Sequence, residues 1–329
     1  MPCADLKLRE SDIAISNKIQ EVARDLLHKR EVDLVIGFEL GSLPLRFTPC
    51  FIRDENEVER LVWNSFCVNN LAKYLVKRPE KVAIVAKGCD VRTIIELIKE
   101  NQISRDRVVI IGVPYHDGMV DRRRIEDELE GQEILAVEEK EDSIILVGDG
   151  FTKVVDRKDY LCLCCEDGID KNPAIYDILI GDLVEKKVAC QCPDVAEFQA
   201  ESAEERWKYI SDEVNKCIRC YACRNACPLC YCKECFVDNT RPQWIGKTTD
   251  PSDTLIFHIT RAMHLAGRCV ECGSCERACP MGVDIRKLNK KLVSDVRGLF
   301  GYEAGINLKE VAPLATFRPD DPEGFMLNP

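Results

Sequence analysis

Two cysteine-rich runs stand in the last third of the chain. The first, CIRCYACRNACP, covers residues 217–228, and the second, CVECGSCERACP, covers residues 269–280. Both follow the pattern C-x2-C-x2-C-x3-C-P. Three thiols at two-residue gaps on one loop can face three irons of a cubane, and the proline turns the chain away after the fourth cysteine. The repeated spacing therefore predicts two 4Fe-4S clusters.

The fourth cysteine of each run is expected to exchange partners. In proteins that carry two such runs, this cysteine ligates the cluster of the other run. One predicted cluster is therefore held by Cys217, Cys220, Cys223 and Cys279, and the other by Cys269, Cys272, Cys275 and Cys227. The alternative is a pair of structural zinc sites, but zinc usually takes two C-x2-C pairs set well apart.

Composition favours a metal over disulfides as the role of the cysteines. The chain has 329 residues, 20 cysteines and a formal net charge of −11. A core of this size does not need disulfide staples, and clustered cysteines in a reducing compartment more often bind metal. The sequence lacks a leader-like start and an apolar run of ~18–20 residues, so we expect a cytoplasmic protein without direct membrane insertion. The acidic balance argues against nucleic-acid binding.

Three further cysteines follow the first run at once, in the segment PLCYCKEC. Cys230, Cys232 and Cys235 are either spare or redox-labile thiols beside a cluster, or ligands of a third cluster with Cys190 or Cys192 as the fourth. Three cysteines within six residues are hard to explain as core filler, where cysteine acts only as a small apolar side chain.

The first part of the chain alternates strand and helix patterns. Strands are predicted at 32–37, 81–86, 108–113, 134–137, 143–146 and 174–180, and helices at 13–27, 58–75, 91–101 with Asp90 as N-cap, and 122–129. Helices are predicted later at 205–214, 254–265 and 285–299. We expect an α/β N-terminal domain (1–192), a linker (193–204), a mainly α-helical two-cluster ferredoxin domain (205–300) and an extended tail (301–329).

Cys89 lies between a predicted strand and a predicted helix. A helix N-terminus stabilises a thiolate, which suits a nucleophile or a metal ligand. The sequence places no candidate base nearby, so a ligand is favoured, with an inert buried thiol as the alternative. A second local group is Cys162, Cys164 and Cys165, which precedes the segment DILIG at 177–181.

These parts together resemble a known family over about residues 15–185. A strand, a Gly-Cys turn, a helix, a strand with Gly112, then C-x2-C-x-D and Asp-Ile-x-x-Gly are similar to beta subunits of deazaflavin coenzyme (F420)-reducing hydrogenases and formate dehydrogenases. The resemblance implies a 4Fe-4S cluster on Cys89, Cys162 and Cys165, with Cys164, Cys190, Cys192 or His116 as the fourth ligand. It also implies FAD, although no G-x-G-x-x-G follows a strand.

Residues 205–300 resemble the α-helical ferredoxin domains of heterodisulfide reductase small subunits and fumarate reductase iron–sulfur subunits. Together, the two resemblances imply an electron-transfer subunit of a cytoplasmic multi-subunit oxidoreductase, linked to a heterodisulfide reductase, formate dehydrogenase or hydrogenase. Its expected partners are other subunits of such a complex, a flavoprotein among them. One alternative is an FAD-containing enzyme subunit that acts on a deazaflavin or nicotinamide; another is a structural adaptor whose clusters staple the fold.

Overall fold

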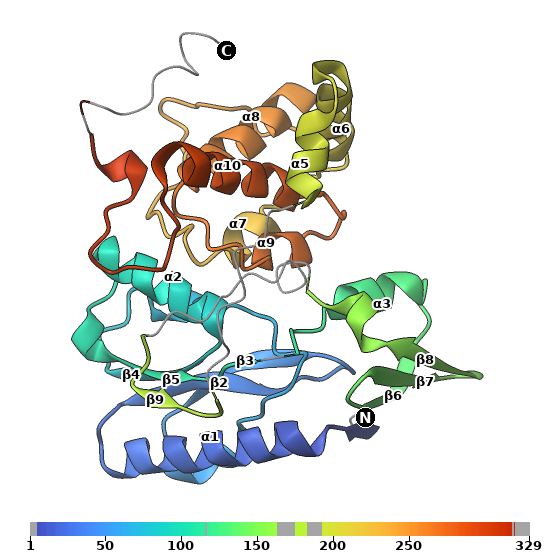
Figure 1. Ribbon diagram of the computed structural model, residues 1–329, viewed down its shortest axis with the longest axis vertical. Coiled ribbons are helices and arrows are strands. Elements are labelled where there is room, and N and C mark those ends of the chain that lie inside the picture. Colours follow the sequence, from blue (N-terminus) through green and yellow to red (C-terminus); the bar gives the residue numbers. More distant parts are fainter. Residues whose placement is uncertain (1–4, 116, 163–174, 183–192, 318, 320–329) are drawn as a thin grey trace. The chain divides into compact units, whose positions relative to one another are not determined.

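The computed structural model describes residues 5–115, 117–162, 175–182, 193–317 and 319 (Figure 1). Contacts divide the chain into two compact units. The first unit consists of residues 1–91 and 103–189, and the second of residues 92–102 and 190–329. The first is a mixed α/β unit with two sheets, and the second is helical, so the predicted fold class is confirmed.

A five-stranded sheet forms the centre of the first unit. Its strands, in spatial order, are β3(Phe47–Ile52), β2(Leu34–Leu40), β4(Val82–Ala86), β5(Val108–Gly112) and β9(Ile178–Leu179). Strands β2, β4, β5 and β9 are parallel, and β3 is antiparallel to β2. Every residue of β4 is buried, as expected for a strand covered on both faces. Helix α1(Glu10–His28) runs along the sheet in Figure 1 and buries Ile19, Ala23 and Leu26.

A second sheet has the order β1(Asp5–Lys7), β6(Ile134–Glu139), β7(Ser143–Gly148) and β8(Phe151–Asp156). Strand β1 is parallel to β6, and the other pairs are antiparallel. Alternate residues of β7, Ile144 and Leu146, are fully buried, which gives this sheet one inner face. The short helix α3(Arg122–Glu128) precedes β6. Strands β1, β3 and β8 were not among the predicted elements.

The predicted helix over 58–75 is wrong. The structure has two separate 3-10 turns there, Glu55–Arg60 and Leu71–Leu75. Asn64 and Asn70 explain the difference, because their side-chain oxygens accept the backbone N–H groups of Phe66 (2.9 Å) and Ala72 (3.1 Å). Such local bonds offer the backbone an alternative to helical hydrogen bonding.

Asp90 is not the N-cap of its helix, because α2(Gly88–Lys99) begins two residues earlier. The carboxylate of Asp90 is fully buried in the first turn. It accepts hydrogen bonds from the backbone N–H of Leu71 (2.7 Å) and Lys87 (3.1 Å), and it pairs with Lys87 Nζ at 2.8 Å. Asp90 therefore ties the end of β4, the start of α2 and the preceding 3-10 turn together.

The second unit consists mainly of helices. They are α5(Pro193–Ala200), α6(Ala203–Asn215), α7(Ala222–Ala226), α8(Pro251–His264), α9(Ser274–Arg277) and α10(Ile285–Phe300), and residues 92–99 of α2 belong to the same unit. Ser202 and Glu205 form a capping box at α6, and Asp250 caps α8 ahead of Pro251. The core of this unit joins Phe257, Val237 and Ile285 to the side chains of Cys223 and Cys279.

The first residues after α10 are anchored within the second unit. Tyr302 and Ala304 are buried. The guanidinium of Arg92 donates two hydrogen bonds to the Ala304 carbonyl (3.0 and 2.6 Å), and Gly305 N–H donates to Glu96 Oε1 (2.6 Å). Gly305 has φ +74°, and a Cβ there would lie 2.5 Å from the Arg92 carbonyl oxygen, so only glycine fits. Across the described residues, every helix is too short or too polar to cross a membrane.

Replacing Asp90 tests the role of its buried carboxylate in the first unit. We expect Asp90→Ala to lower the free energy of unfolding by about 3–5 kcal/mol, because it leaves the Lys87 ammonium buried without its carboxylate. Asp33→Ala is the matched control, because this exposed carboxylate accepts a backbone bond from Lys81 (2.9 Å); its cost is about 1 kcal/mol. Anaerobic urea unfolding followed by circular dichroism measures both, and equal midpoints would contradict the assignment.

Candidate iron–sulfur sites

The two cysteine runs adopt the same backbone conformation. In the first, Arg219 and Tyr221 have φ +53° and +59°, and the short helix α7 follows; in the second, Glu271 and Gly273 have φ +55° and +69°, and α9 follows. Arginine, tyrosine and glutamate seldom adopt this left-handed region. Such residues persist where the surrounding structure requires an unusual loop, and they concentrate at functional sites.

Hydrogen bonds at the ends of the runs also correspond. Cys227 N–H donates to Arg224 O (3.3 Å), as Cys279 N–H donates to Glu276 O (3.0 Å). Three residues further, Cys230 N–H donates to Cys227 O and Gly282 N–H donates to Cys279 O, both at 3.4 Å. The repeated sequence therefore produces a repeated loop, helix and turn.

Several N–H groups of the loops point at cysteine sulfurs. Arg219 N–H donates to Cys217 Sγ (3.3 Å), and the backbone N–H of Glu271 does the same for Cys269. Val283 N–H donates to Cys279 Sγ (3.4 Å) and Asn289 Nδ2 to Cys275 Sγ (3.7 Å). Donors of this kind stabilise negative charge on the sulfurs of iron–sulfur clusters and tune their potential.

Thiols of the two runs lie within electrostatic range of one another. The thiol of Cys217 interacts electrostatically with Cys279 of the other run as well as with Cys220. The thiol of Cys275 interacts with Cys227 of the first run as well as with Cys272. Among the residues that the structure describes, no three cysteine, histidine or carboxylate side chains are arranged to hold one metal ion. The thiols of the two runs therefore lie near one another, but they are not arranged as the ligands of a single metal ion.

Burial makes negative charge costly at these thiols. It raises the pKa of Cys223 and of Cys275 to about 11, and it also raises the pKa of Cys269. Since thiolates are the form that binds iron, loading must release protons from these groups. The donor set, all thiol and largely shielded from water, fits iron–sulfur clusters.

Arg261 on α8 supplies a buried cation among the thiols. Its side chain is 4% exposed, and its largest charge interactions are with Cys275, Cys227, Cys230 and Cys223. It donates to the Cys223 carbonyl (3.3 Å), while its Nε has no hydrogen-bond partner. A guanidinium in this position stabilises anionic sulfur. No sequence motif pointed to Arg261; the available signal was a charged residue on the apolar face of the predicted helix 254–265.

The N-terminal candidates are described only in part. Cys89 lies in the first turn of α2, and its carbonyl accepts a bond from Asn70 Nδ2 (3.2 Å). The ammonium of Lys87 is buried and interacts with the Cys89 thiol. Cys162 is buried, and its N–H donates to Met119 O (2.6 Å). Cys164, Cys165, Cys190, Cys192 and His116 lie outside the described residues.

Cys89 follows β4, and residues 114 and 115 follow the adjacent parallel strand β5. Parallel strands end at one edge of a sheet, where open α/β sheets bind their ligands. The structure therefore places Cys89 on the edge where a ligand of this unit is expected.

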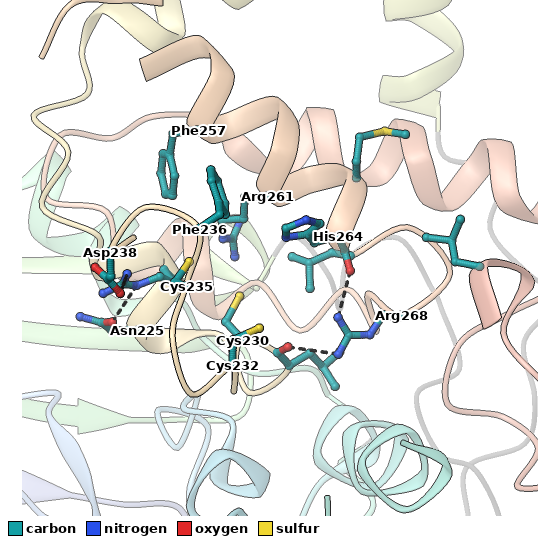
Figure 2. A pocket seen from close by; sticks show the side chains of 15 residues that line it. Asn225, Cys230, Cys232, Cys235, Phe236, Asp238, Phe257, Arg261, His264 and Arg268 are labelled. Atoms are coloured by element: carbon teal, nitrogen blue, oxygen red, sulfur yellow. Dashed lines mark hydrogen bonds and ion pairs between the residues drawn. The ribbon is translucent and has the colours of Figure 1, made fainter. Parts of the chain in front are cut away.

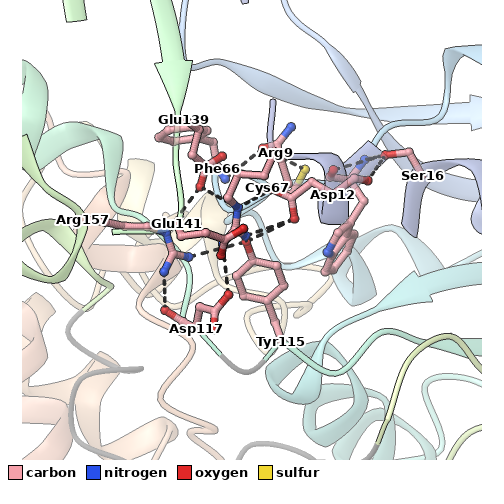
Figure 3. Close-up of polar contacts among 12 residues, drawn as sticks. Arg9, Asp12, Ser16, Phe66, Cys67, Tyr115, Asp117, Glu139, Glu141 and Arg157 are labelled. Atoms are coloured by element: carbon pink, nitrogen blue, oxygen red, sulfur yellow. Dashed lines mark hydrogen bonds and ion pairs between the residues drawn. The ribbon is translucent and has the colours of Figure 1, made fainter. Parts of the chain in front are cut away.

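A buried network of charged side chains includes Tyr115, which follows β5 (Figure 3). No sequence pattern predicted this network. Arg9 pairs with Asp12 (3.0 Å) and Glu139 (3.6 Å), and Arg157 pairs with Glu139 (3.4 Å). Tyr115 contacts the guanidinium of Arg9, and burial raises its pKa well above the usual range. Desolvation also raises the pKa of the Asp12 and Glu139 carboxyls. Arg9 also pairs with the exposed carboxylates of Asp117 (3.0 Å) and Glu141 (3.5 Å). The network fixes α1 against the second sheet through the buried pairs of Arg9 with Asp12 and Glu139.

Cys230, Cys232 and Cys235 line one cavity of about 670 Å³ in the second unit (Figure 2). Arg261, His264 and Phe236 line the same cavity. The two cysteines predicted as a possible fourth ligand, Cys190 and Cys192, are outside the described residues. Two further cysteines, Cys50 and Cys67, are buried in the first unit, and burial raises the pKa of Cys50 to about 12.

A known family matches the part of the chain that contains both cysteine runs. The family described as "4Fe-4S dicluster domain" matches residues 213–283, which contain both cysteine runs through Cys279. Such a domain holds two 4Fe-4S clusters, so the prediction of two clusters in this part of the chain is confirmed at that level.

Two relatives cover both units. The F420-dependent formate dehydrogenase subunit beta of Methanocaldococcus jannaschii is 29% identical over 86% of this chain and 89% of its own length. The F420-dependent formate dehydrogenase 1 subunit beta of Methanococcus maripaludis is 26% identical over 91% of this chain and 95% of its own. A chain of the F420-reducing [NiFe] hydrogenase complex from Methanosarcina barkeri shares 13% identity over 50% of this chain and 61% of that one, with a TM-score of 0.36.

The relatives confirm the resemblance read from the motifs of the N-terminal part, and their alignment continues through the dicluster domain. Over most of its length, this chain is therefore similar to beta subunits of F420-dependent formate dehydrogenases, and its residues 213–283 match a 4Fe-4S dicluster domain.

Proposed function

We propose that this chain is the iron–sulfur beta subunit of a cytoplasmic multi-subunit oxidoreductase, in which it carries electrons between the deazaflavin F420 and a formate dehydrogenase or hydrogenase subunit. The observation that carries this proposal is that two cysteine loops of the same spacing and backbone conformation bring their thiols within electrostatic range of one another, Cys217 with Cys279 and Cys275 with Cys227. The two relatives are F420-dependent formate dehydrogenase beta subunits, which supports formate dehydrogenase and F420 as the electron donor and acceptor.

The clusters, when bound, supply one-electron redox chemistry that no side chain has. The chain's own residues set the conditions for it. Residues with left-handed backbone conformation shape the two loops. Backbone N–H groups such as that of Arg219 donate to cysteine sulfurs, and the guanidinium of Arg261 offsets negative charge on the thiolates. Burial of Cys223 and Cys279 in the core limits access of water. All these groups stabilise charge on sulfur without taking part in bond making.

The N-terminal unit is proposed to hold the exchange site for the two-electron carrier. The family resemblance implies a further 4Fe-4S cluster in this unit. Its proposed ligands are Cys89, Cys162 and Cys165, and the fourth ligand is Cys164, Cys190, Cys192 or His116. Supporting this, Cys89 stands at a helix start beside the buried Lys87 cation, at the carboxyl edge of the parallel strands. FAD in this unit would convert two-electron to one-electron transfer.

Turnover of the complex tests the proposed relay. In the assembled anaerobic complex, we expect Cys220→Ser and Cys272→Ser each to slow formate- or hydrogen-driven F420 reduction by about 100-fold or more, because each removes one cluster from the path. Reduction of an artificial dye by the partner subunit should stay unchanged. Stopped-flow absorbance measures both reactions, and Cys50→Ala, in a strand of the first unit, is the matched cysteine control.

If either cluster were lost without slowing F420 reduction, the relay would be refuted and the role of structural adaptor would stand. If the single chain, purified with stoichiometric flavin, oxidised reduced F420 with a dye as the acceptor, it would act as an enzyme subunit in its own right.

Removing the buried cation tests how the site tunes potential. In the wild-type protein, the positive charge of Arg261 stabilises the reduced cluster, which is the more negative form. We therefore expect Arg261→Gln to shift the reduction potential of a cluster to a more negative value. Each 1.4 kcal/mol of lost stabilisation corresponds to about 59 mV for a one-electron couple. Arg261→Lys should shift the potential much less, because it keeps the positive charge. Arg206→Gln, on α6, should leave the potential unchanged, because this guanidinium donates to the carbonyls of Gln199 (3.1 Å) and Glu201 (2.5 Å). Redox titration monitored by electron paramagnetic resonance decides, and equal potentials in all four proteins would contradict the role.

A further inference from the structure

A third group of thiols lies beside the two cysteine runs, in a cavity of its own. Cys230, Cys232 and Cys235 come from one short segment after α7, and all three line the cavity of about 670 Å³ shown in Figure 2. The volume lies in the range of about 300–1,000 Å³ that is typical of ligand sites. The three thiols therefore share a space large enough for a bound group.

These thiols do not behave as core side chains. Cys232 is exposed, and Cys230 and Cys235 are half-buried. By contrast, Cys50 and Cys67 of the first unit are almost fully buried, at 1% and 0% exposure. A cysteine that serves as a small apolar side chain is expected in the second setting. The position of the three thiols at a cavity wall thus calls for another explanation.

The wall of the cavity also contains a buried cation with unused bonding capacity. Arg261 is 4% exposed, lines the cavity, and has no hydrogen-bond partner for its Nε. Its charge acts on Cys230 as well as on Cys227 and Cys275 of the two runs. A buried guanidinium with an orphaned N–H favours an anionic occupant. Arg268, which lines the same cavity, already donates hydrogen bonds to Glu100 Oε2 (2.8 Å) and Tyr231 Oη (3.0 Å).

A single metal ion does not suit this space. Zinc binds thiolates at about 2.3 Å, which would draw the three sulfurs into one small shell. Within the described part of the chain, no three ligand-type side chains stand that close together. The same holds for the thiols of the two runs, which are spread around regions expected to contain cubanes. The size of the cavity fits a polynuclear cluster in preference to a single ion.

We propose that Cys230, Cys232 and Cys235 hold a third 4Fe-4S cluster in this cavity, with the fourth iron towards its remaining space. Cys230 contacts Cys227, a predicted ligand of one dicluster cubane, so the third cluster is a direct neighbour of that cubane. Arg261 then offsets the charge of both. The inference rests on the proposed function for its role, which is to lengthen the electron relay by one step; binding of the cluster does not depend on that role.

The metal content of the full-length chain, prepared without oxygen, tests this site. We expect Cys232→Ser/Cys235→Ser to lose about four irons and about four acid-labile sulfides per chain relative to wild type. A matched control, Cys50→Ala/Cys67→Ala, should lose none. Unchanged iron and sulfide in the test variant would overturn the proposal, and so would the loss of a single zinc ion in place of iron.

A milder variant keeps the test informative if the double variant does not fold. Cys232 is exposed, so Cys232→Ser leaves the core intact. We expect it to lower the iron and acid-labile sulfide content of the chain and to weaken the paramagnetic signal of this cluster, because only Cys230 and Cys235 remain as ligands. A spectrum identical to wild type would refute the site. Intact F420 reduction by a wild-type chain that binds no iron at Cys230, Cys232 and Cys235 would refute this inference alone, whereas a bound cluster at this site without electron transfer would refute the proposed function alone.

Discussion

Negative charge on buried sulfur is the constraint on which the second unit depends. Burial raises the pKa of thiols such as Cys223 and Cys275, so the unloaded site disfavours the thiolates that bind iron. The chain offsets this cost with N–H donors aimed at sulfur and with the guanidinium of Arg261. The metal itself supplies the remainder, because thiolates bonded to iron share their charge with the cluster.

The proposed exchange of the fourth cysteine between runs would make metal binding part of the fold. Cys223 and Cys279 pack in one apolar cluster with Phe257 and Ile285, so two of the proposed ligands are also core side chains. The helices that carry this core, α8 and α10, begin at N-cap residues Asp250 and Asp284, whose side chains accept hydrogen bonds from backbone N–H groups of the first turn. Cluster loss should therefore loosen the whole helical unit, while the first unit keeps a separate core around its parallel strands.

The spacing of the cysteines and the periodicity of apolar residues predicted much of the structure. Features that depend on contacts between distant parts of the chain were not predicted. The two cysteine runs, the parallel strands and the long helices have signals that a few neighbouring residues contain. The helix expected over 58–75 failed because Asn64 and Asn70 bond to the nearby backbone, which apolar periodicity does not register. Arg261 and the network of Arg9, Glu139 and Arg157 were missed because their partners come from distant parts of the chain. A charge gains meaning only when the fold shows what faces it.

The exchange of ligands is tested most directly by comparing the paramagnetic resonance of single-cysteine variants of the reduced protein, enriched in 57Fe and prepared without oxygen. Wild type should contain at least eight irons in 4Fe-4S clusters. Cys279→Ser should alter the same cluster signal as Cys220→Ser, and Cys227→Ser the same signal as Cys272→Ser. The account would be contradicted if each variant altered only the signal of its own run, or if the wild-type protein contained zinc or disulfides in place of iron and sulfide.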